Sequence, residues 1–153
     1  MISYIFKKII GSKNDREVKK LRPLVVKINE IEQGFQSLSD EQLRAKTAEW
    51  KARLAAERQQ RGYDGLLQKA NQLDSEMNSE AAKIERRKAA ALEQEILNDL
   101  LPEAFAAVKN ACRRMFDRKE KVVVRDHEMA WDMIPFDVQL IGGIALHMGR
   151  SAE

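Results

Sequence analysis

Hydrophobic residues recur every three or four positions along most of the chain, and this spacing predicts long helices. The first clear stripe lies within residues 18–35. Either Asn14 or Asp15 is expected to cap this helix, and Pro23 is expected to kink or restart it. The apolar members of the stripe are Val18, Leu21, Val25, Ile28, Ile31 and Phe35.

The next segment opens with a strong helix-start signal, LSDEQL, at residues 38–43. Ser39 is expected at the N-cap and Gln42 three positions later, an arrangement known as a capping box. The helix should run to about Arg61, where the sequence GYDG at 62–65 breaks it.

Residues 66–98 contain neither glycine nor proline and are rich in residues that favour helix. Their apolar seam is thin and partly alanine, which is typical of a helix that pairs with one partner helix. We therefore expect residues 55–98 to be mostly helical and antiparallel to a helix at 39–61. The seam consists of Ala70, Leu73, Met77, Ala81 and Ile84.

The last third of the chain predicts a helix, a short strand and a second helix. Pro102 suits the first position of the first of these helices. Residues 122–124, three valines, predict the strand. The inner face of the helix that starts at Pro102 is expected to hold Phe105, Val108, Cys112 and Met115.

The second helix is expected from Pro135 to about Met148 and is apolar on nearly all sides. Such a helix belongs inside a larger domain. Gly142 and Gly143 each lower its stability by about 1 kcal/mol relative to alanine. Their presence is expected where another backbone approaches closely.

Composition and charge narrow the classes of function. Only 7 glycines and 3 prolines occur in 153 residues, which favours helices over a turn-rich β fold. The net charge of +3 is too small to indicate nucleic-acid binding. The single cysteine, Cys112, excludes an intrachain disulfide framework, and its place on a helix face predicts a small buried hydrophobic residue. Neither His127 nor His147 has clustered ligands in the sequence, so no metal site is expected.

The N-terminal residues 2–10, ISYIFKKII, predict a short amphipathic helix. One interpretation is a helix that binds a membrane surface or a partner. The other is a helix that packs on its own domain or frays. No apolar run approaches the roughly 18 residues that span a bilayer.

Four blocks resemble, in order, the SecA family of bacterial preprotein translocase ATPases. They cover nearly the whole chain except about 55–98 and the valine stretch. The resemblance implies the N-terminal helices of a P-loop helicase-like motor domain. It also implies a motor α/β sheet that lies outside this chain. Residues 55–98 are longer than the family's usual link between these helices, so we expect a long helical insertion there, and the residue pattern itself predicts at most one short strand. The blocks are residues 11–32, 38–54, 100–116 and 135–153.

In that family the glutamine of the sequence FDVQ holds the adenine of ATP, and here it is Gln139. Its amide offers a donor and an acceptor, which can match adenine N7 and N6. Met133 and Phe136 match family positions that pack against the adenine ring, and a thioether and an aromatic ring suit such a face. From the pattern alone, Gln139 would be an ordinary glutamine on a helix face.

The parts that act on phosphate are expected beyond this chain. No G-x-x-x-x-G-K-[ST] sequence occurs, and the resemblance places that loop shortly after Glu153. The carboxylates that hold Mg²⁺ are expected there too. We therefore expect no catalytic residue and no tight ATP binding in these 153 residues, and ATP hydrolysis only in a complete protein.

The residue pattern and the resemblance together predict four segments: an amphipathic N-terminal helix at 1–10, motor helices at 11–54, an insertion at 55–98 and the start of the nucleotide-binding domain at 99–153. The resemblance also implies an ATP-driven motor that moves preproteins through the SecYEG channel. The implied partners are SecYEG, preproteins, an anionic membrane contacted by residues 1–10, and a second copy in a homodimer.

The implied location is the cytoplasm, with peripheral binding at the inner face of the bacterial plasma membrane. Without the resemblance, the same pattern would suit a different class of protein. That alternative is a non-catalytic helical interaction module with a coiled arm and a membrane- or partner-binding N-terminal helix.

Overall fold

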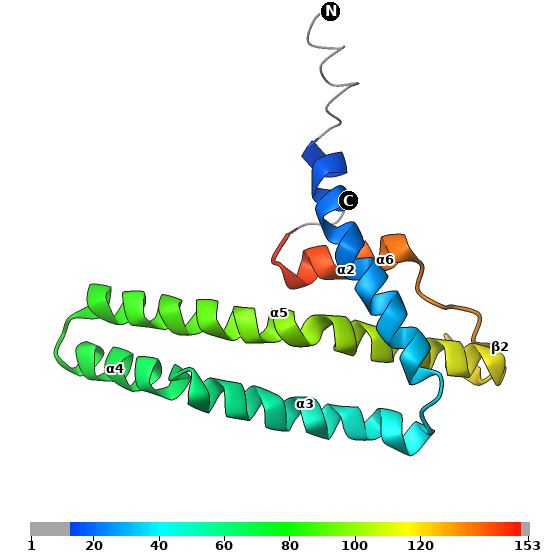
Figure 1. The fold of residues 1–153 in the computed structure, drawn as a ribbon, viewed down its shortest axis with the longest axis horizontal. Coiled ribbons are helices and arrows are strands. Elements are labelled where there is room, and N and C mark those ends of the chain that lie inside the picture. Colours follow the sequence, from blue (N-terminus) through cyan, green and yellow to red (C-terminus); the bar gives the residue numbers. More distant parts are fainter. Residues whose placement is uncertain (1–12, 151–153) are drawn as a thin grey trace, which may run out of the picture. The chain divides into compact units, whose positions relative to one another are not determined.

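The computed structural model describes residues 13–150, and most of them lie in helices (Figure 1). The prediction of a mainly α fold is confirmed. The helix predicted at 2–10 lies outside the described residues. Across 13–150, no helix is both long enough and apolar enough to cross a membrane. In chain order the elements are α2 (Lys13–Phe35), α3 (Asp40–Gln60), α4 (Tyr63–Ser75), α5 (Ser79–Asp117), β1 (Lys121–Val124), β2 (His127–Ala130) and α6 (Asp137–His147).

The described chain divides into two compact units. The first unit combines the residues up to Ser37 with those from Pro102 onward, and the second unit is residues 38–101. Helix α3, which was predicted with the segment 11–54, falls in the second unit together with most of the predicted insertion. The assignment of segments to a motor and an insertion stays a prediction.

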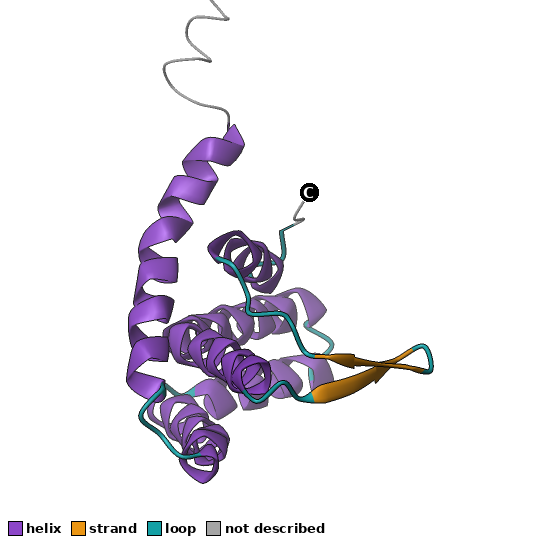
Figure 2. Ribbon diagram, turned by 90° about the vertical axis from the view of Figure 1, so that its right-hand side faces the viewer, coloured by secondary structure: helices purple, strands orange, loops and turns teal. Residues whose placement is uncertain are grey.

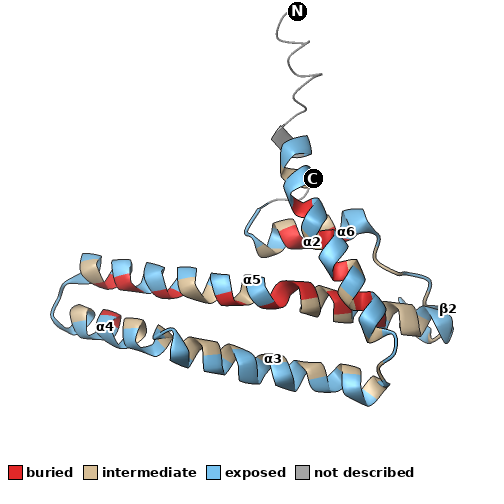
Figure 3. Ribbon diagram, viewed as in Figure 1, coloured by how far each residue is buried: buried red, intermediate tan, exposed pale blue. Residues whose placement is uncertain are grey.

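Helix α2 buries one face in the first unit, and Figure 3 shows this face in red. The predicted stripe is correct in its middle but not at its end. Ile31 and Phe35 are only half-buried, and the buried face ends instead on Glu32, which is 2% exposed. The predicted members that are buried are Leu21, Val25 and Ile28.

Two further expectations about α2 are wrong. Asn14 and Asp15 lie inside the helix, so neither is its N-cap. The helix also continues through Pro23 without a restart. Proline removes the N–H that would bind the carbonyl of Lys19. Both Pro23 and Lys19 are exposed, so water can satisfy that carbonyl.

The second unit begins with the predicted capping box. The Ser39 hydroxyl accepts from the Gln42 backbone N–H at 3.2 Å, and the Gln42 side-chain carbonyl accepts from the Ser39 N–H at 2.7 Å. The predicted break after Arg61 is also correct, although it is shorter than GYDG. Gly62 takes a left-handed φ of 74°, and α4 resumes at Tyr63.

The helix predicted at 66–98 is interrupted by a turn at residues 76–78, so the predicted seam is wrong beyond that point. Met77 has a left-handed φ of 58° and is 95% exposed, and Ile84 is 52% exposed. The Asn78 side chain accepts from the Ala81 N–H at 3.3 Å and so caps α5. The face that α5 buries in this unit instead holds Ala82, Glu85, Ala89 and Ile96.

Within the second unit, α5 runs antiparallel to α3 and α4, as the ion pairs between them show (Figure 1). Arg58 of α3 pairs with Glu93, and Lys69 of α4 pairs with Glu85 at 3.1 Å. Residue numbers rise along one side of this series and fall along the other. The predicted antiparallel pairing is therefore present, with α5 rather than one unbroken 66–98 helix as the partner.

Helix α5 also contains Pro102, which was expected to start a new helix. The helix is continuous from Ser79 to Asp117, and the boundary between the two units falls at this proline. Proline at a helix start and proline inside a helix have the same sequence signature when no other breaker is nearby. The missing N–H removes one bond of the helix ladder at this place.

A small β-hairpin follows α5 and stands out in Figure 2. The predicted strand at 122–124 is confirmed as β1, but a second strand, β2, pairs with it, so the expectation of at most one strand is wrong. The two strands are joined through Arg125 and Asp126, which have φ of 50° and 65°. Two central residues with positive φ suit a tight hairpin turn.

Candidate functional site

An open pocket of about 300 Å³ lies in the first unit. Its floor and walls come from the last part of α5, from the link after the hairpin, and from the first turn of α6. The lining is almost wholly apolar, and Gln139 supplies the one amide. The lining residues are Phe105, Val108, Cys112, Trp131, Met133, Pro135, Gln139 and Leu140.

The α5 residues of this pocket were predicted as the inner face of a packed helix. Phe105 and Cys112 are half-buried, but Val108 is 60% exposed. Apolar residues at helical spacing therefore form a pocket wall here rather than closed core. The pKa of the Cys112 thiol is raised by burial, so the thiol stays protonated near neutral pH.

The link between the hairpin and α6 is fixed by Trp131. Its backbone N–H donates to the Glu120 carbonyl at 2.7 Å, and its indole N–H donates to the Met133 carbonyl at 2.6 Å. These two bonds hold the segment that carries Met133, one of the lining residues of the pocket.

Gln139 lies in the first turn of α6 and lines the pocket. Its side-chain carbonyl accepts from the Phe136 N–H at 2.8 Å, which satisfies one of the unpaired donors at this helix start. A carbonyl oxygen has two lone pairs, so this bond leaves room for a second donor on the same atom.

The structure brings together two of the three residues to which the family resemblance assigns an adenine contact. Gln139 and Met133 line the same pocket. Phe136 is 74% exposed and is not among the lining residues, although its backbone N–H holds the Gln139 side chain. The adenine role of all three residues stays a prediction.

Helix α6 begins at Asp137, two residues after the predicted Pro135, and packs on α5 through Gly143. A Cβ at Gly143 would lie 2.8 Å from Phe105 Cε1. The close approach expected at this glycine is therefore real, but its partner is an aromatic side chain and not another backbone. Leu140 and Ile144 are the buried residues of α6, and Val138 and Leu146 are exposed.

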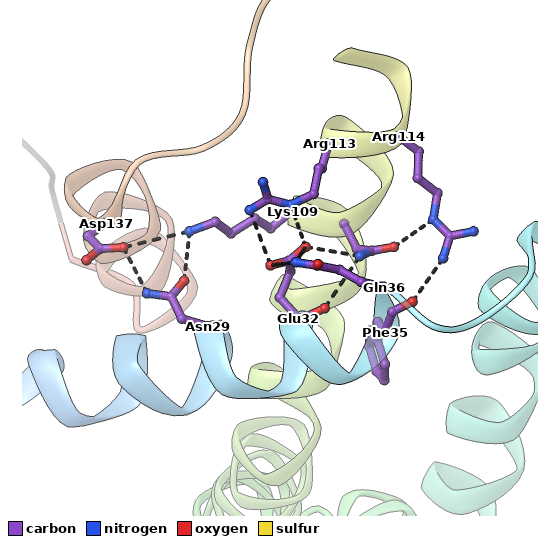
Figure 4. Close-up of polar contacts among 9 residues, drawn as sticks. Asn29, Glu32, Phe35, Gln36, Lys109, Arg113, Arg114 and Asp137 are labelled. Atoms are coloured by element: carbon purple, nitrogen blue, oxygen red, sulfur yellow. Dashed lines mark hydrogen bonds and ion pairs between the residues drawn. The ribbon is translucent and has the colours of Figure 1, made fainter. Parts of the chain in front are cut away.

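A polar cluster around the buried Glu32 carboxylate joins α2 to α5 (Figure 4). Arg113 donates to the Glu32 carboxylate at 2.9 Å, Asn110 donates to it at 3.0 Å, and Gln36 donates to it at 3.1 Å. Burial alone would raise the pKa of Glu32, but these hydrogen bonds outweigh it and lower the pKa. The carboxylate is therefore charged, and three side chains donate hydrogen bonds to it.

Sequence reasoning missed this cluster and the adjoining contacts of Asn29 and Lys109. One signal was available. Glu32 lies four residues after Ile28 and seven after Val25, on the apolar face of α2. A carboxylate at such a position requires a buried partner. No sequence pattern indicates that Arg113 supplies it, about 80 positions away along the chain.

In the described part of the chain, His, Cys, Asp and Glu side chains form no group of three that could hold a metal ion. The pocket lining also contains no Lys or Arg. Its chemistry suits a flat apolar ring with hydrogen-bonding edges, and the charged phosphates of a nucleotide would need groups from elsewhere.

The chain is similar to proteins of one family. The family model described as "SecA DEAD-like domain" matches residues 6–153. The protein translocase subunit SecA of Chlorobium phaeobacteroides strain BS1 is 44% identical over 161 residues, and that of Prosthecochloris aestuarii is 42% identical over 162 residues. Each alignment covers 97% of this chain. The SecA of Chloroherpeton thalassium is 39% identical over the full length of this chain.

The chain spans about 15% of the length of each of these relatives. No solved structure matches it. The family match and the relatives agree with the resemblance drawn from the four sequence blocks. The chain corresponds to an N-terminal segment of its relatives, and it belongs to the SecA DEAD-like domain family.

Proposed function

We propose that this chain is an N-terminal segment of an ATP-driven motor that moves preproteins through the SecYEG channel. Within that motor it supplies one side of the adenine pocket. The observation that carries the proposal is that Gln139 and Met133 line one apolar pocket in a chain of the SecA family. The names of the relatives support the link to translocation.

The pocket suits adenine in size and in chemistry. Its volume of about 300 Å³ is at the lower end of the range for small-molecule sites, about 300–1,000 Å³. The thioether of Met133 offers a polarisable contact for the ring. The Gln139 amide offers an acceptor for the N6 amino group and a donor for N7.

The remaining parts of the motor follow from the family. Phosphate binding and the Mg²⁺ that accompanies ATP belong to residues beyond this chain. SecYEG, preproteins, an anionic membrane surface contacted by residues 1–10 and a homodimer partner belong to the same proposal. So does a cytoplasmic location at the inner face of the plasma membrane.

The experiment uses a full-length protein that carries this segment and compares Gln139→Glu with the unmodified protein. The new carboxylate can still accept from the Phe136 N–H and from adenine N6, but it has no donor for N7. ATP affinity, measured by isothermal titration, should fall about five- to hundredfold, within the range for a bidentate base contact, because the bond to N7 is lost and a carboxylate then faces the N7 lone pair. The unmodified protein should prefer ATP to 7-deaza-ATP, and the variant should not.

Gln33→Glu is the control, because Gln33 is an exposed glutamine on α2 of the same unit. It should leave both affinities unchanged. If Gln139→Glu keeps the preference for ATP over 7-deaza-ATP, Gln139 does not read adenine. If the full-length protein binds no ATP, the proposal gives way to the helical interaction module.

A further inference from the structure

The first turn of α6 is tied to α2 and α5 by three polar side chains that point toward one another in Figure 4. Lys109 Nζ donates to Asn29 Oδ1 at 2.7 Å, and Asn29 Nδ2 donates to Asp137 Oδ1 at 3.0 Å. Lys109 Nζ also lies 3.8 Å from the same Asp137 oxygen. Asn29 therefore uses both ends of its amide to connect the lysine to α6.

The burial of Lys109 requires polar partners of this kind. Lys109 is 9% exposed, and a buried ammonium group needs polar partners to offset its lost hydration. The partners within its reach are the Asn29 carbonyl and the Asp137 carboxylate. Asp137 also occupies the first turn of α6, where the helix dipole favours a negative charge.

Gln139 lies in the same helical turn, two residues after Asp137. Its carbonyl is held by the N–H of Phe136, the residue just before Asp137. A shift of Asp137 would therefore move both the Gln139 side chain and the group that orients it.

We propose that Asn29 and Lys109 are positioning residues that set the Gln139 amide for adenine through Asp137. This inference rests on the proposed role of Gln139. It predicts that loss of the connection weakens the reading of adenine, while nucleotide binding through other groups is retained.

The rest of α6 does not depend on this connection for its packing. Leu140 and Ile144 are buried, and Gly143 lies against the Phe105 ring. Removal of the polar connection should therefore change the direction of the first turn without releasing the helix.

The test variant in the full-length protein is Asn29→Asp. It keeps the acceptor for Lys109 but replaces the Nδ2 donor with a carboxylate oxygen that faces Asp137 at about 3.0 Å. The two carboxylates repel each other, so the first turn of α6 should move. The ratio of ATP affinity to GTP affinity should fall roughly two- to tenfold, the equivalent of one net hydrogen bond.

The double variant Asn29→Asp with Asp137→Asn restores the pattern with the two groups exchanged. The new amide at position 137 can donate to the new carboxylate at position 29, and the net charge equals that of the unmodified protein. The affinity ratio should return to within about twofold of the original. Gln33→Glu, which adds the same charge to the same helix away from Asp137, should leave the ratio unchanged.

Asp137→Ser provides a second variant if Asn29→Asp fails to fold. The Asp137 side chain is 63% exposed, and Lys109 keeps its hydrogen bond to Asn29 when the carboxylate is removed. It should lower the ratio in the same direction. A purely structural role would lower the melting temperature and leave the ratio unchanged, and that result overturns the inference. The inference is also overturned if the double variant does not recover the original ratio of ATP affinity to GTP affinity.

The two proposals can fail separately. If Gln139→Glu abolishes the preference for ATP over 7-deaza-ATP while Asn29→Asp and Asp137→Ser leave the ATP-to-GTP ratio intact, only the positioning role is wrong. If Gln139→Glu has no effect on that preference, the adenine role itself is wrong.

Discussion

Replacing Gly143 with alanine tests the packing of α6 on α5. The added Cβ would lie 2.8 Å from Phe105 Cε1 and 3.2 Å from Cζ, whereas carbon atoms normally pack at about 3.5–4.0 Å. The ring would have to retreat by about 0.7 Å to reach even the lower limit. Overpacking of this kind costs about 1–3 kcal/mol, and alanine in place of glycine returns up to about 1 kcal/mol of helix stability.

The matched control is Gly34→Ala, because Gly34 lies in α2 of the same unit and has nothing within 4 Å of its added Cβ. In the control, alanine gives the same gain in helix stability, but its Cβ meets no neighbouring atom. The free energy of unfolding of Gly143→Ala should therefore be about 1–3 kcal/mol below that of Gly34→Ala, measured by urea denaturation. For a chain of this size, that corresponds to a difference of about 2–12 °C in melting temperature.

A second change identifies the clash. Phe105→Leu shortens the side chain that meets the new methyl group, so it should cost less in the Gly143→Ala background than in the original protein. The difference between those two costs is the coupling between the two positions. If Gly143→Ala is as stable as Gly34→Ala, or if the coupling is zero, the packing of α6 on Phe105 is not as described.

Two other predictions concern stability. Ser39→Ala should lower the free energy of unfolding by about 1 kcal/mol, because the Gln42 N–H loses its acceptor, and Ser39→Asp should regain most of it in the same urea titration. Since the pKa of Glu32 is lowered in the folded protein, its stabilisation is complete above the ordinary glutamate pKa of about 4.5 and is lost as the pH falls through the lower folded value. Glu32→Gln should cost about 1–3 kcal/mol at pH 7 and flatten the loss of stability in acid, whereas Glu30→Gln, at an exposed position of α2, should leave that loss unchanged. An equally steep acid loss in Glu32→Gln would contradict the second prediction.

Local signals in the sequence predicted the elements that depend on local chemistry. The Ser39 capping box, the break at Gly62 and the β1 strand are each encoded within a few residues, and all three are present. The turn at 76–78 was missed because Met77, rather than glycine, adopts the left-handed conformation. The strand β2 was missed for a similar reason, since two non-glycine residues form its turn.

The contacts that shape the site could not be predicted from local pattern. The stripe of Phe105, Val108 and Cys112 was identified correctly as an apolar face, but periodicity does not distinguish a face that packs from one that lines an open pocket. The hydrogen bonds between distant polar residues are harder still to predict from the sequence. Asn29 and Asp137 are 108 positions apart, and neither residue has a sequence neighbour that indicates the other.

The division of the chain explains how a site can depend on residues so distant in sequence. Every residue that lines the pocket belongs to the first unit, and so do Asn29, Lys109 and Asp137. The ion pairs between α5 and the helices α3 and α4 belong to the second unit, residues 38–101. The second unit buries its own face of α5 with alanines and a paired glutamate, so its folding uses contacts that the pocket does not share. A long segment between α2 and the last part of α5 is therefore compatible with a pocket that lies wholly after it and is joined to α2 through Asn29. The packing of α2 against α6, rather than proximity along the chain, brings Asn29 within hydrogen-bond distance of Asp137.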